Sequence, residues 1–419
     1  MKALTKISIG FLALAAAALW FTSCSSEDVA QNGGSQSDKE SLLTLTINTG
    51  KIMGSRTTDW TSDPAGANES KISAITIGIF DSHTKNVKAI IEPTKGSDDA
   101  TPGDNQFTYS TTDKKITAKV IAKALSVNDD VLVAVNHAGN FGSVSDENSF
   151  NAVTESLSEA LGTGTSQDNT NIPMYGTGKL DAGSSANSFK ADDIAVKRLL
   201  AKITLNKLSV GFSGIYASAE FTPTCCFLIN VPEKLKFADG KDSWDMTAAF
   251  NSGWAKYDSS AGSFTYTTEN SEIGCTFKEF LTTKNLSDPL TALTGTAVYG
   301  GSSSPSKVFF YTMPNGNDKA STKNTKLVIA GKFKANSTAQ EQMVYYPVPL
   351  NVTIDGGTET SGHVGDDMYK VYPNKNYICD VTIKTIGVAN PNLNLDPQDA
   401  TITIKVEDWT SVNQTTIFD

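Results

Sequence analysis

The chain is dominated by short stretches in which apolar and polar residues alternate, a pattern typical of strands with one buried face. In the first stretch the apolar side chains that would share a face are Leu43, Leu45 and Ile47. A loop with Gly, Ser and one arginine, Arg56, follows. The sequence contains one other arginine, Arg198, so an arginine-specific protease would have two places to cut. A cut after the first of them would separate the strand from the rest of the chain.

A strand of the same design lies near the C-terminus. Ile402, Ile404 and Val406 alternate with polar residues, and the alternation shifts parity at Trp409. Residues 388–399, which contain prolines and several asparagines, are predicted to be a linker before this strand. On pattern alone, both strands can be ordinary edge strands of one monomer. The alternative is that the final strand of one molecule replaces the first strand of another.

Strand-like stretches bounded by Gly, Asn, Asp and Pro also fill the middle of the chain, and long helical patterns are scarce. They predict an all-β protein built of sandwiches. The run at 131–136 is apolar throughout, so we expect it to be buried on both faces. The predicted strands are residues 71–80, 87–91, 107–110, 115–120, 131–136, 225–231, 307–313, 326–333, 344–354 and 377–386.

One helix is predicted, over residues 149–161, because apolar residues from Phe150 to Leu161 recur at helical spacing. Glu155 and Glu159 would then lie on its solvated face. We therefore expect one short helix in the first half of an otherwise β protein, and no catalytic role for either carboxylate.

With 419 residues, the chain is long enough for two ordinary domains. A long apolar segment at 194–210 lies near its middle. The second half of that segment alternates as a strand, whereas 196–200 also fits a helix. The predicted divisions are a signal peptide at 1–23, a tether at 24–40, the first strand and its cleavable loop at 41–56, sandwiches at 57–195 and 196–387, and the linker with the final strand at 388–419.

The N-terminus has the pattern of a bacterial lipoprotein signal. Lys2 and Lys6 precede an apolar run, residues 7–21, that is too short for a comfortable membrane span. Small residues then lead to Cys24. This order predicts cleavage before Cys24 and lipid on its thiol. An ordinary signal peptide that happens to contain a cysteine is the alternative.

Composition and motif content argue against several functions. The net charge of -10 disfavours binding to a phosphate backbone, so no nucleic-acid partner is predicted. No catalytic or metal-binding motif is present, and neither enzyme activity nor a cofactor nor a metal is predicted. We expect His83, His137 and His363 to be surface or turn residues. The cysteines after the signal lack C-x-x-C spacing and are predicted to be small buried residues, with a disulfide left open: Cys225, Cys226, Cys275 and Cys379.

In the order of its motifs the sequence resembles the Bacteroidales fimbrillins, the subunits of type V pili. The match runs from the signal to the final block, and the order of short motifs carries it. These motifs are Cys24, the strand followed by Arg56, the strand at 75–80, the run at 131–139, the strand at 197–205, residues 345–348, residues 376–383 and the block at 406–414.

The resemblance implies two transthyretin-like β-sandwich domains and export as an outer-membrane lipoprotein to the cell surface. It also implies cleavage between Arg56 and Thr57 by an arginine-specific protease. The subunit would then polymerise into a fimbrium that supports adhesion, by strand exchange with other copies or related fimbrial subunits.

By the same resemblance, the first strand would be displaced and the final strand would be the donor. Two alternatives stay open. One is a monomeric surface lipoprotein that binds a glycan or a host ligand, and the other is a fimbrial tip or anchor subunit. The residues implied are Leu43, Leu45 and Ile47 in the displaced strand, and Ile402, Ile404, Val406 and Trp409 in the donor strand.

Overall fold

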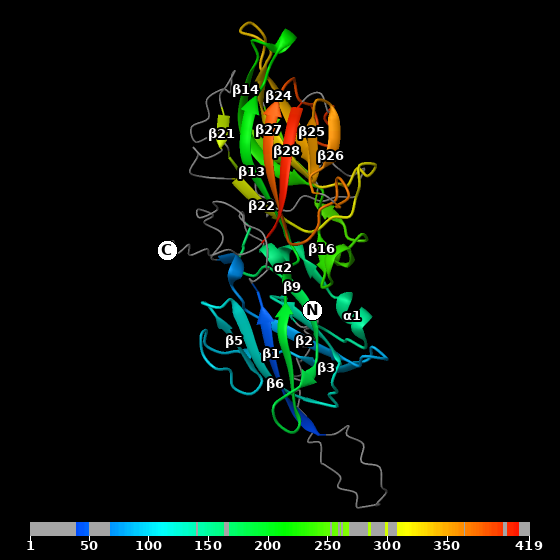
Figure 1. Ribbon diagram of the computed structural model, residues 1–419. Coiled ribbons are helices and arrows are strands. Elements are labelled where there is room, and N and C mark those ends of the chain that lie inside the picture. The colour runs from blue at the N-terminus through cyan, green and yellow to red at the C-terminus, as the bar shows by residue number, and fades with distance from the viewer. Residues whose placement is uncertain are drawn as a thin grey trace, which may run out of the picture. The chain divides into compact units, whose positions relative to one another are not determined.

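Strands arranged in two β-sandwiches make up most of the described chain (Figure 1), which confirms the all-β prediction. Within the described residues, no helix is long and apolar enough to cross a membrane. The computed structural model describes residues 39–49, 68–139, 141–162, 167–251, 254–258, 260, 263–267, 284–285, 298–300, 308–363, 365–396 and 400–409.

The first sandwich consists of a six-stranded and a five-stranded sheet. Its strands are β1 (Glu40–Asn48), β2 (Ile75–Phe80), β3 (Val87–Ile91), β4 (Thr94–Lys95), β5 (Gln106–Ser110), β6 (Lys115–Lys123), β7 (Asp130–Val135), β9 (Met174–Lys179), β10 (Asp181–Ala182), β11 (Ser188–Ala195) and β12 (Lys197–Arg198). The larger sheet has the order β10-β11-β1-β6-β5-β4, and the smaller has the order β12-β9-β7-β2-β3.

The core of the first sandwich lies between these sheets. Strands β1, β5 and β6 contribute their alternate residues from one side, and β2 and β7 contribute theirs from the other. Every residue of β2 and β7 is buried, because the outer face of their sheet is covered as well. Phe80 and Leu132 on that outer face pack with Phe150 and Leu157 of the helical segment. The double burial confirms the prediction for residues 131–136.

Two short helices replace the single helix predicted at 149–161. They are α1 (Glu147–Asn151) and α2 (Leu157–Leu161), and a short strand, β8 (Thr154–Ser156), separates them. Strand β8 pairs antiparallel with β16 (Lys234–Lys236) of the second half of the chain. The prediction was wrong because the apolar spacing continues through the break, while the backbone of β8 is held by a strand that is distant in sequence.

Each short helix begins at its own capping box. Asp146 accepts a hydrogen bond from the backbone N–H of Ser149 at 2.7 Å. At the second helix, Ser156 and Glu159 cap each other in the same reciprocal way. Such reciprocal caps satisfy backbone donors at a helix start, so both helix starts are encoded locally.

The second sandwich consists of a seven-stranded and a four-stranded sheet. Its strands are β13 (Ala201–Val210), β14 (Glu220–Ile229), β20 (Lys284–Asn285), β21 (Val298–Gly300), β22 (Val308–Thr312), β23 (Lys326–Lys334), β24 (Gln342–Pro349), β25 (Val352–Asp355), β26 (Thr358–Ser361), β27 (Lys375–Ile383) and β28 (Ala400–Asp408). The larger sheet has the order β21-β13-β27-β28-β25-β26, with β22 also on β13, and the smaller has the order β20-β14-β23-β24.

Short elements complete the described chain, and none of them is a helix at 196–200, where β12 lies instead. They are the strands β15 (Val231–Pro232), β17 (Phe250–Asn251), β18 (Trp254–Asp258) and β19 (Ser263–Thr267), and the 3-10 turns η2 (Asn68–Ser70), η3 (Gly214–Tyr216) and η4 (Gly240–Ser243).

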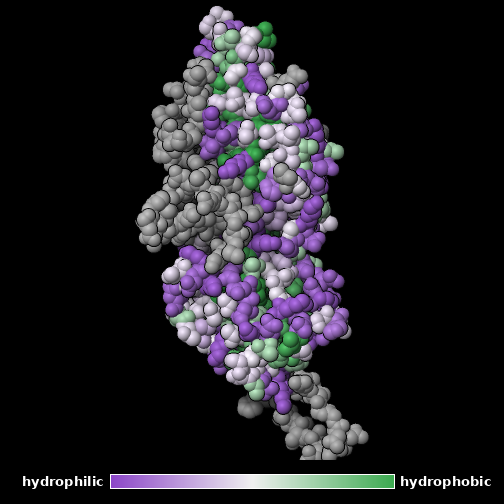
Figure 2. All heavy atoms as spheres, in the orientation of Figure 1, coloured by the Kyte–Doolittle hydropathy of each residue, from purple (hydrophilic) through white to green (hydrophobic). Residues whose placement is uncertain are grey.

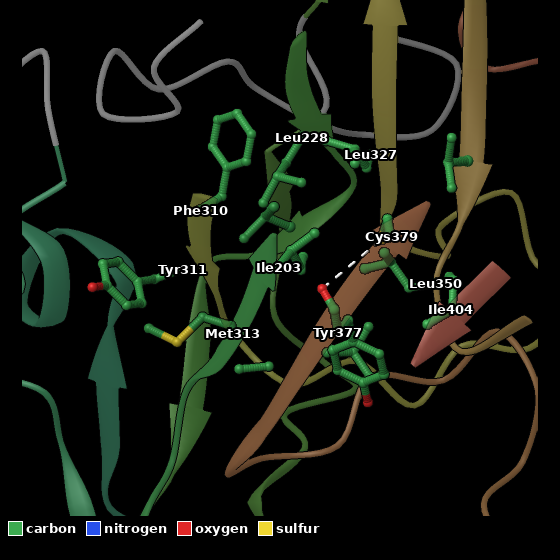
Figure 3. Close-up of a cluster of buried hydrophobic side chains, with 14 of the residues drawn as sticks. Ile203, Leu228, Phe310, Tyr311, Met313, Leu327, Leu350, Tyr377, Cys379 and Ile404 are labelled. Carbon is green, nitrogen blue, oxygen red and sulfur yellow. Dashed lines mark hydrogen bonds between the residues drawn. The ribbon is translucent and has the colours of Figure 1, made fainter. Parts of the chain in front are cut away.

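Side chains from both sheets meet in the core of the second sandwich, as Figure 3 shows for Ile203, Tyr377 and Ile404 on one side and Leu228 and Leu327 on the other. The final strand therefore belongs to this core. The second domain extends to Trp409, which corrects the predicted boundary at 387.

Three of the predicted buried cysteines are buried free thiols, namely Cys225, Cys226 and Cys379, whereas Cys275 lies outside the described residues. Burial raises the pKa of the Cys225 thiol to about 12. A thiol held in its protonated form is a poor nucleophile, so Cys225 is a packing residue.

The visible face of the molecule is mainly hydrophilic, with small scattered apolar areas (Figure 2). The exposed large apolar side chains among the described residues are Ile121, Val127, Ile215, Met246, Met368 and Leu393. Scattered apolar residues of this kind are normal on a soluble surface.

Gly78 of β2 is a position where the fold has no room for a side chain. A Cβ atom there would lie 2.6 Å from a ring carbon of Phe80 and 2.8 Å from one of Phe150. We expect Gly78→Ala to lower the free energy of unfolding by about 1–3 kcal/mol through overpacking. Chemical denaturation measures this change. Gly103→Ala, which meets only the flexible Gln106 side chain, should change it by less than about 0.5 kcal/mol. Equal effects at both positions would contradict the packing argument.

Candidate assembly site around the first strand

The first strand, β1, is an interior strand of its sheet. It pairs antiparallel with β6 and parallel with β11. On β6 its residues lie opposite Val120 (for Leu43), Ala118 (for Leu45) and Ile116 (for Ile47). Removing β1 would therefore leave two facing rows of unpaired backbone groups, one on β6 and one on β11.

The three apolar side chains predicted to share a face of β1 do so. Leu43, Leu45 and Ile47 each have an exposed fraction of 0%, and all three belong to the core of the first sandwich. The polar residues between them are partly exposed. The alternation predicted for this strand is confirmed.

Hydrogen bonds at both ends fix β1 between its neighbours. The Leu42 N–H donates to the carbonyl oxygen of Asn187 at 3.1 Å, and the Val196 N–H donates to that of Asn48 at 3.0 Å. The Thr49 N–H donates to the carbonyl oxygen of Lys114, also at 3.0 Å. The strand is thus held along its whole length and just beyond it.

A bulge interrupts the pairing of β1 with β11. The register shifts between Leu45 and Ile47, whose partners are Ala191 and Ile194. Asp193, on the bulged side, has a positive φ of 57° and accepts a hydrogen bond from the Asn48 side chain at 3.0 Å. An extra residue of this kind pins the register of a strand pair.

The predicted lipidation and cleavage residues, Cys24, Arg56 and Thr57, lie outside the described residues. The second arginine, Arg198, is described and is 3% exposed. Its Nη1 donates to the carbonyl oxygen of Trp409 at 2.8 Å. A protease cannot reach a side chain enclosed in this way in the folded protein.

The predicted donor strand forms part of β28, inside the chain's own second sheet. It pairs with β27 over nine residue pairs, and its Ile402 also lies opposite Ile354 of β25. Ile402, Ile404 and Val406 are buried, and so is Trp409. The predicted alternation is confirmed, and in this structure the strand is an interior strand of its own sheet.

The two sandwiches repeat one arrangement. In each, the first strand lies between an antiparallel strand and a later parallel strand: β1 lies between β6 and β11, and β13 between β22 and β27. On the far side of the parallel strand the second sandwich has the nine-residue β28, whereas the first has only the two-residue β10.

A buried polar cluster, which the sequence patterns did not indicate, surrounds Trp409. Its indole N–H donates to Glu69 Oε2 at 2.9 Å. The other carboxylate oxygen, Oε1, accepts from Lys202 Nζ at 3.0 Å and from the Tyr311 hydroxyl at 2.6 Å. The Tyr311 ring stacks on the indole, with centroids 5.4 Å apart. With Arg198, these residues form what we call the Trp409 cluster.

Glu155 also differs from its prediction, and it lies beside His137. Glu155 is fully buried on β8, and its Oε2 lies 3.4 Å from Nε2 of His137. The His137 side chain is only 8% exposed and lies edge-on to Phe141 and Phe237. Burial raises the pKa of Glu155 to about 8, although the N–H of Ala138 opposes the shift. Glu155 is therefore not the solvated surface group predicted from the sequence, whereas His137 lies in the loop after β7 with its ring packed inward.

No protein-family model matches the chain, and no curated protein sequence matches it. Solved structures do match. A fimbrilin from Porphyromonas gingivalis W83 is 18% identical, with a TM-score of 0.58 over 89% of this chain and 99% of that one. A candidate cell adhesion protein from Bacteroides eggerthii is 18% identical, with a TM-score of 0.57 over 90% and 98%.

A second candidate cell adhesion protein, from Parabacteroides distasonis, is 14% identical, with a TM-score of 0.56 over 89% of this chain and 100% of that one. At these identities the likeness concerns the fold. It extends over both sandwiches, since each match covers about nine-tenths of the chain. The described chain is thus fimbrillin-like in its fold.

Proposed function

We propose that the chain is a structural subunit of a cell-surface fimbrium that supports adhesion. It is exported as a lipoprotein through Cys24, cut after Arg56, and polymerised when a strand from another copy or a related subunit takes the place of β1. The observation that supports this most is that β1 is an interior core strand with a potential cleavage site shortly after it. The fimbrilin-like fold agrees with it.

The energetics of β1 favour replacement over simple loss. Burying each of its three apolar side chains contributes about 1.5–3 kcal/mol, or roughly 5–9 kcal/mol together. Backbone hydrogen bonds add on the order of 1 kcal/mol each. A whole domain is stable by only about 5–15 kcal/mol. A sandwich that has lost β1 therefore has a strong thermodynamic reason to take up another strand.

The pattern of β28 matches that of the strand it would replace. Ile402, Ile404 and Val406 present three apolar residues at period two. The residues after Trp409, Thr410 to Asp419, contain no such triplet. We therefore assign the donor role to β28, which must leave its own sheet first. A head-to-tail contact of this kind does not close on itself, so it builds filaments.

The test uses the chain that begins after Cys24. Brief treatment with an arginine-specific protease should give one cut, with Thr57 as the new N-terminus, because Arg198 is enclosed. Non-boiled electrophoresis should then show a ladder of oligomers. Arg56→Ala should abolish both the cut and the ladder, and the denatured wild-type chain should be cut at both arginines.

Deleting residues 401–419 would remove β28 from the interior of the seven-stranded sheet. The deletion is therefore a poor control for the donor role, because it would also disrupt the second sandwich. Ile404→Asn, cut normally after Arg56, should give no ladder because its donor strand is defective. Since Ile404 is also buried in its own sandwich, calorimetry must show that this sandwich stays folded. Cutting without any ladder in the wild type would contradict polymerisation, and resistance at Arg56 would contradict processing. Either result would favour a monomeric surface lipoprotein that binds a glycan or a host ligand.

A further inference from the structure

The Trp409 cluster joins three segments that are far apart in the chain. Glu69 precedes β2 of the first sandwich, Arg198 and Lys202 flank the passage between the sandwiches, and Trp409 directly follows β28. Each of these four residues is at most 4% exposed. The C-terminal end of β28 is thus tied to the N-terminal domain by a buried charged group.

We propose that the Glu69 carboxylate is a catch that keeps β28 in its own sheet. Its Oε2 accepts the indole N–H of Trp409, while Lys202 and the Tyr311 hydroxyl fix its Oε1. Hydrogen bonds to a charged group are stronger than neutral ones, and they strengthen further in a buried site. Trp409 cannot leave without giving up this bond, so the last residues of β28 cannot peel away from β27 while the catch holds.

The position of Glu69 in the chain connects the catch to processing, and this step rests on the proposed function. In the uncut chain, the segment carrying Glu69 is anchored on both sides, at β1 and at β2. After a cut between Arg56 and Thr57, Glu69 lies twelve residues from a free N-terminus. Chain ends open locally more readily than segments anchored at both ends. Cleavage would thus weaken the catch and free the donor strand, and it would also allow β1 to leave its place between β6 and β11.

Other contacts of Trp409 show why the carboxylate is the release point. Its backbone N–H donates to the carbonyl oxygen of Asn374 at 2.8 Å, and its own carbonyl oxygen accepts from Arg198. Asn374 directly precedes β27 and Arg198 lies in β12, so neither belongs to the segment between Thr57 and β2. Arg198 Nη2 does donate to the backbone carbonyl oxygen of Glu69 at 3.4 Å. Among the described contacts of the indole, the bond to Glu69 is the one that reaches that segment.

Hydrogen exchange of the backbone amides in β28, measured on the uncut chain that begins after Cys24, tests the catch without any assembly. Trp409→Phe keeps an aromatic ring against Tyr311 but removes the indole N–H, and Glu69→Gln keeps the shape but removes the charge. Both should raise exchange in β28 by about 10-fold or more, because a charged hydrogen bond is lost. Amides of β23, in the opposite sheet, should be unchanged.

Trp244→Phe is the matched control. Its indole N–H donates to the carbonyl oxygen of Val371 at 3.1 Å, and its ring packs on Tyr372 rather than on a residue of β28. In this variant the amides of β28 should exchange at the wild-type rate. An equal rise in β23 and β28 in the Trp409→Phe and Glu69→Gln proteins, or no rise in either strand, would overturn the catch and leave the cluster a packing feature.

Cutting the wild type after Arg56 should raise β28 exchange in the same way, and cutting Glu69→Gln should add little more, because both changes open one catch. The two proposals can fail separately. Looser β28 without any ladder after cutting would defeat the fimbrial proposal and support the catch. A ladder from wild-type protein whose β28 exchange is unaltered by cutting or by Glu69→Gln would do the reverse.

Discussion

A chain that begins at Thr57, and so lacks β1, is expected to have a first sandwich that unfolds at least about 10 °C below that of the chain that begins after Cys24. The estimate follows from the roughly 5–9 kcal/mol contributed by Leu43, Leu45 and Ile47, since each kcal/mol shifts the midpoint of a domain of this size by about 2–4 °C. Calorimetry or hydrogen exchange in β6 and β11 would measure the loss.

Adding strands back makes this prediction specific. A synthetic peptide of residues 39–49 should restore the midpoint, because it supplies the same side chains and backbone groups to the gap between β6 and β11. The same peptide with Leu45→Asp should not restore it, since it would bury an unpaired charge. A peptide of residues 400–409 should restore it if β28 is the donor. Full stability of the shortened chain without any peptide would refute the interior role of β1.

A pH dependence of the opposite sense from ordinary acid denaturation is expected from Glu155. Its pKa is raised from 4.5 to about 8 in the folded protein. Between these values the folded state binds more protons than the unfolded state, so the stability contributed by protonated Glu155 is lost as the pH rises. The free energy of unfolding should fall by up to about 4 kcal/mol between pH 5 and pH 9. Denaturant titrations across this range would measure it.

Glu155→Gln should flatten that dependence, because the amide keeps the shape and an oxygen for the Ala138 N–H without ionising. Glu159→Gln is the control. It removes a carboxylate four residues away. Burial raises the pKa of Glu159, but its hydrogen bonds to Ser156 outweigh burial and the pKa is lowered, so this variant should leave the alkaline loss of stability in place. A wild-type protein as stable at pH 9 as at pH 5, or an undiminished slope in Glu155→Gln, would show that Glu155 is charged in the fold without penalty. The groups facing Glu155 are His137 and Glu159, and Lys234 lies on the paired strand.

Period-two alternation predicted β1 and β28, because the buried face of a strand consists of alternate residues within one short stretch. Leu43, Leu45 and Ile47 are buried as expected, and so are Ile402, Ile404 and Val406. The same local pattern does not reveal which strands are neighbours. That β28 lies between β27 and β25 of its own sheet follows from long-range pairing, which no short stretch encodes.

The misplaced helix and the missed cluster have the same physical origin. Residues 149–161 keep helical spacing, yet β8 is pulled into a strand by a partner about eighty residues away. Glu69 and Trp409 are 340 residues apart, and neither stands out in its own surroundings. A glutamate beside an asparagine and a serine in a polar segment looks solvated, and only the folded chain brings an indole and an ammonium group to it.

The bulge at Asp193 bears on how regular a filament of such subunits would be. A flat, uniform groove would accept an incoming strand in several alignments that differ by two residues. The extra residue on β11 breaks that uniformity, because one position along the groove differs from all others. Each junction would then settle at one alignment, and the distance from subunit to subunit would be constant along the fibre. The groove that holds one strand would thus set the axial repeat of the whole fibre.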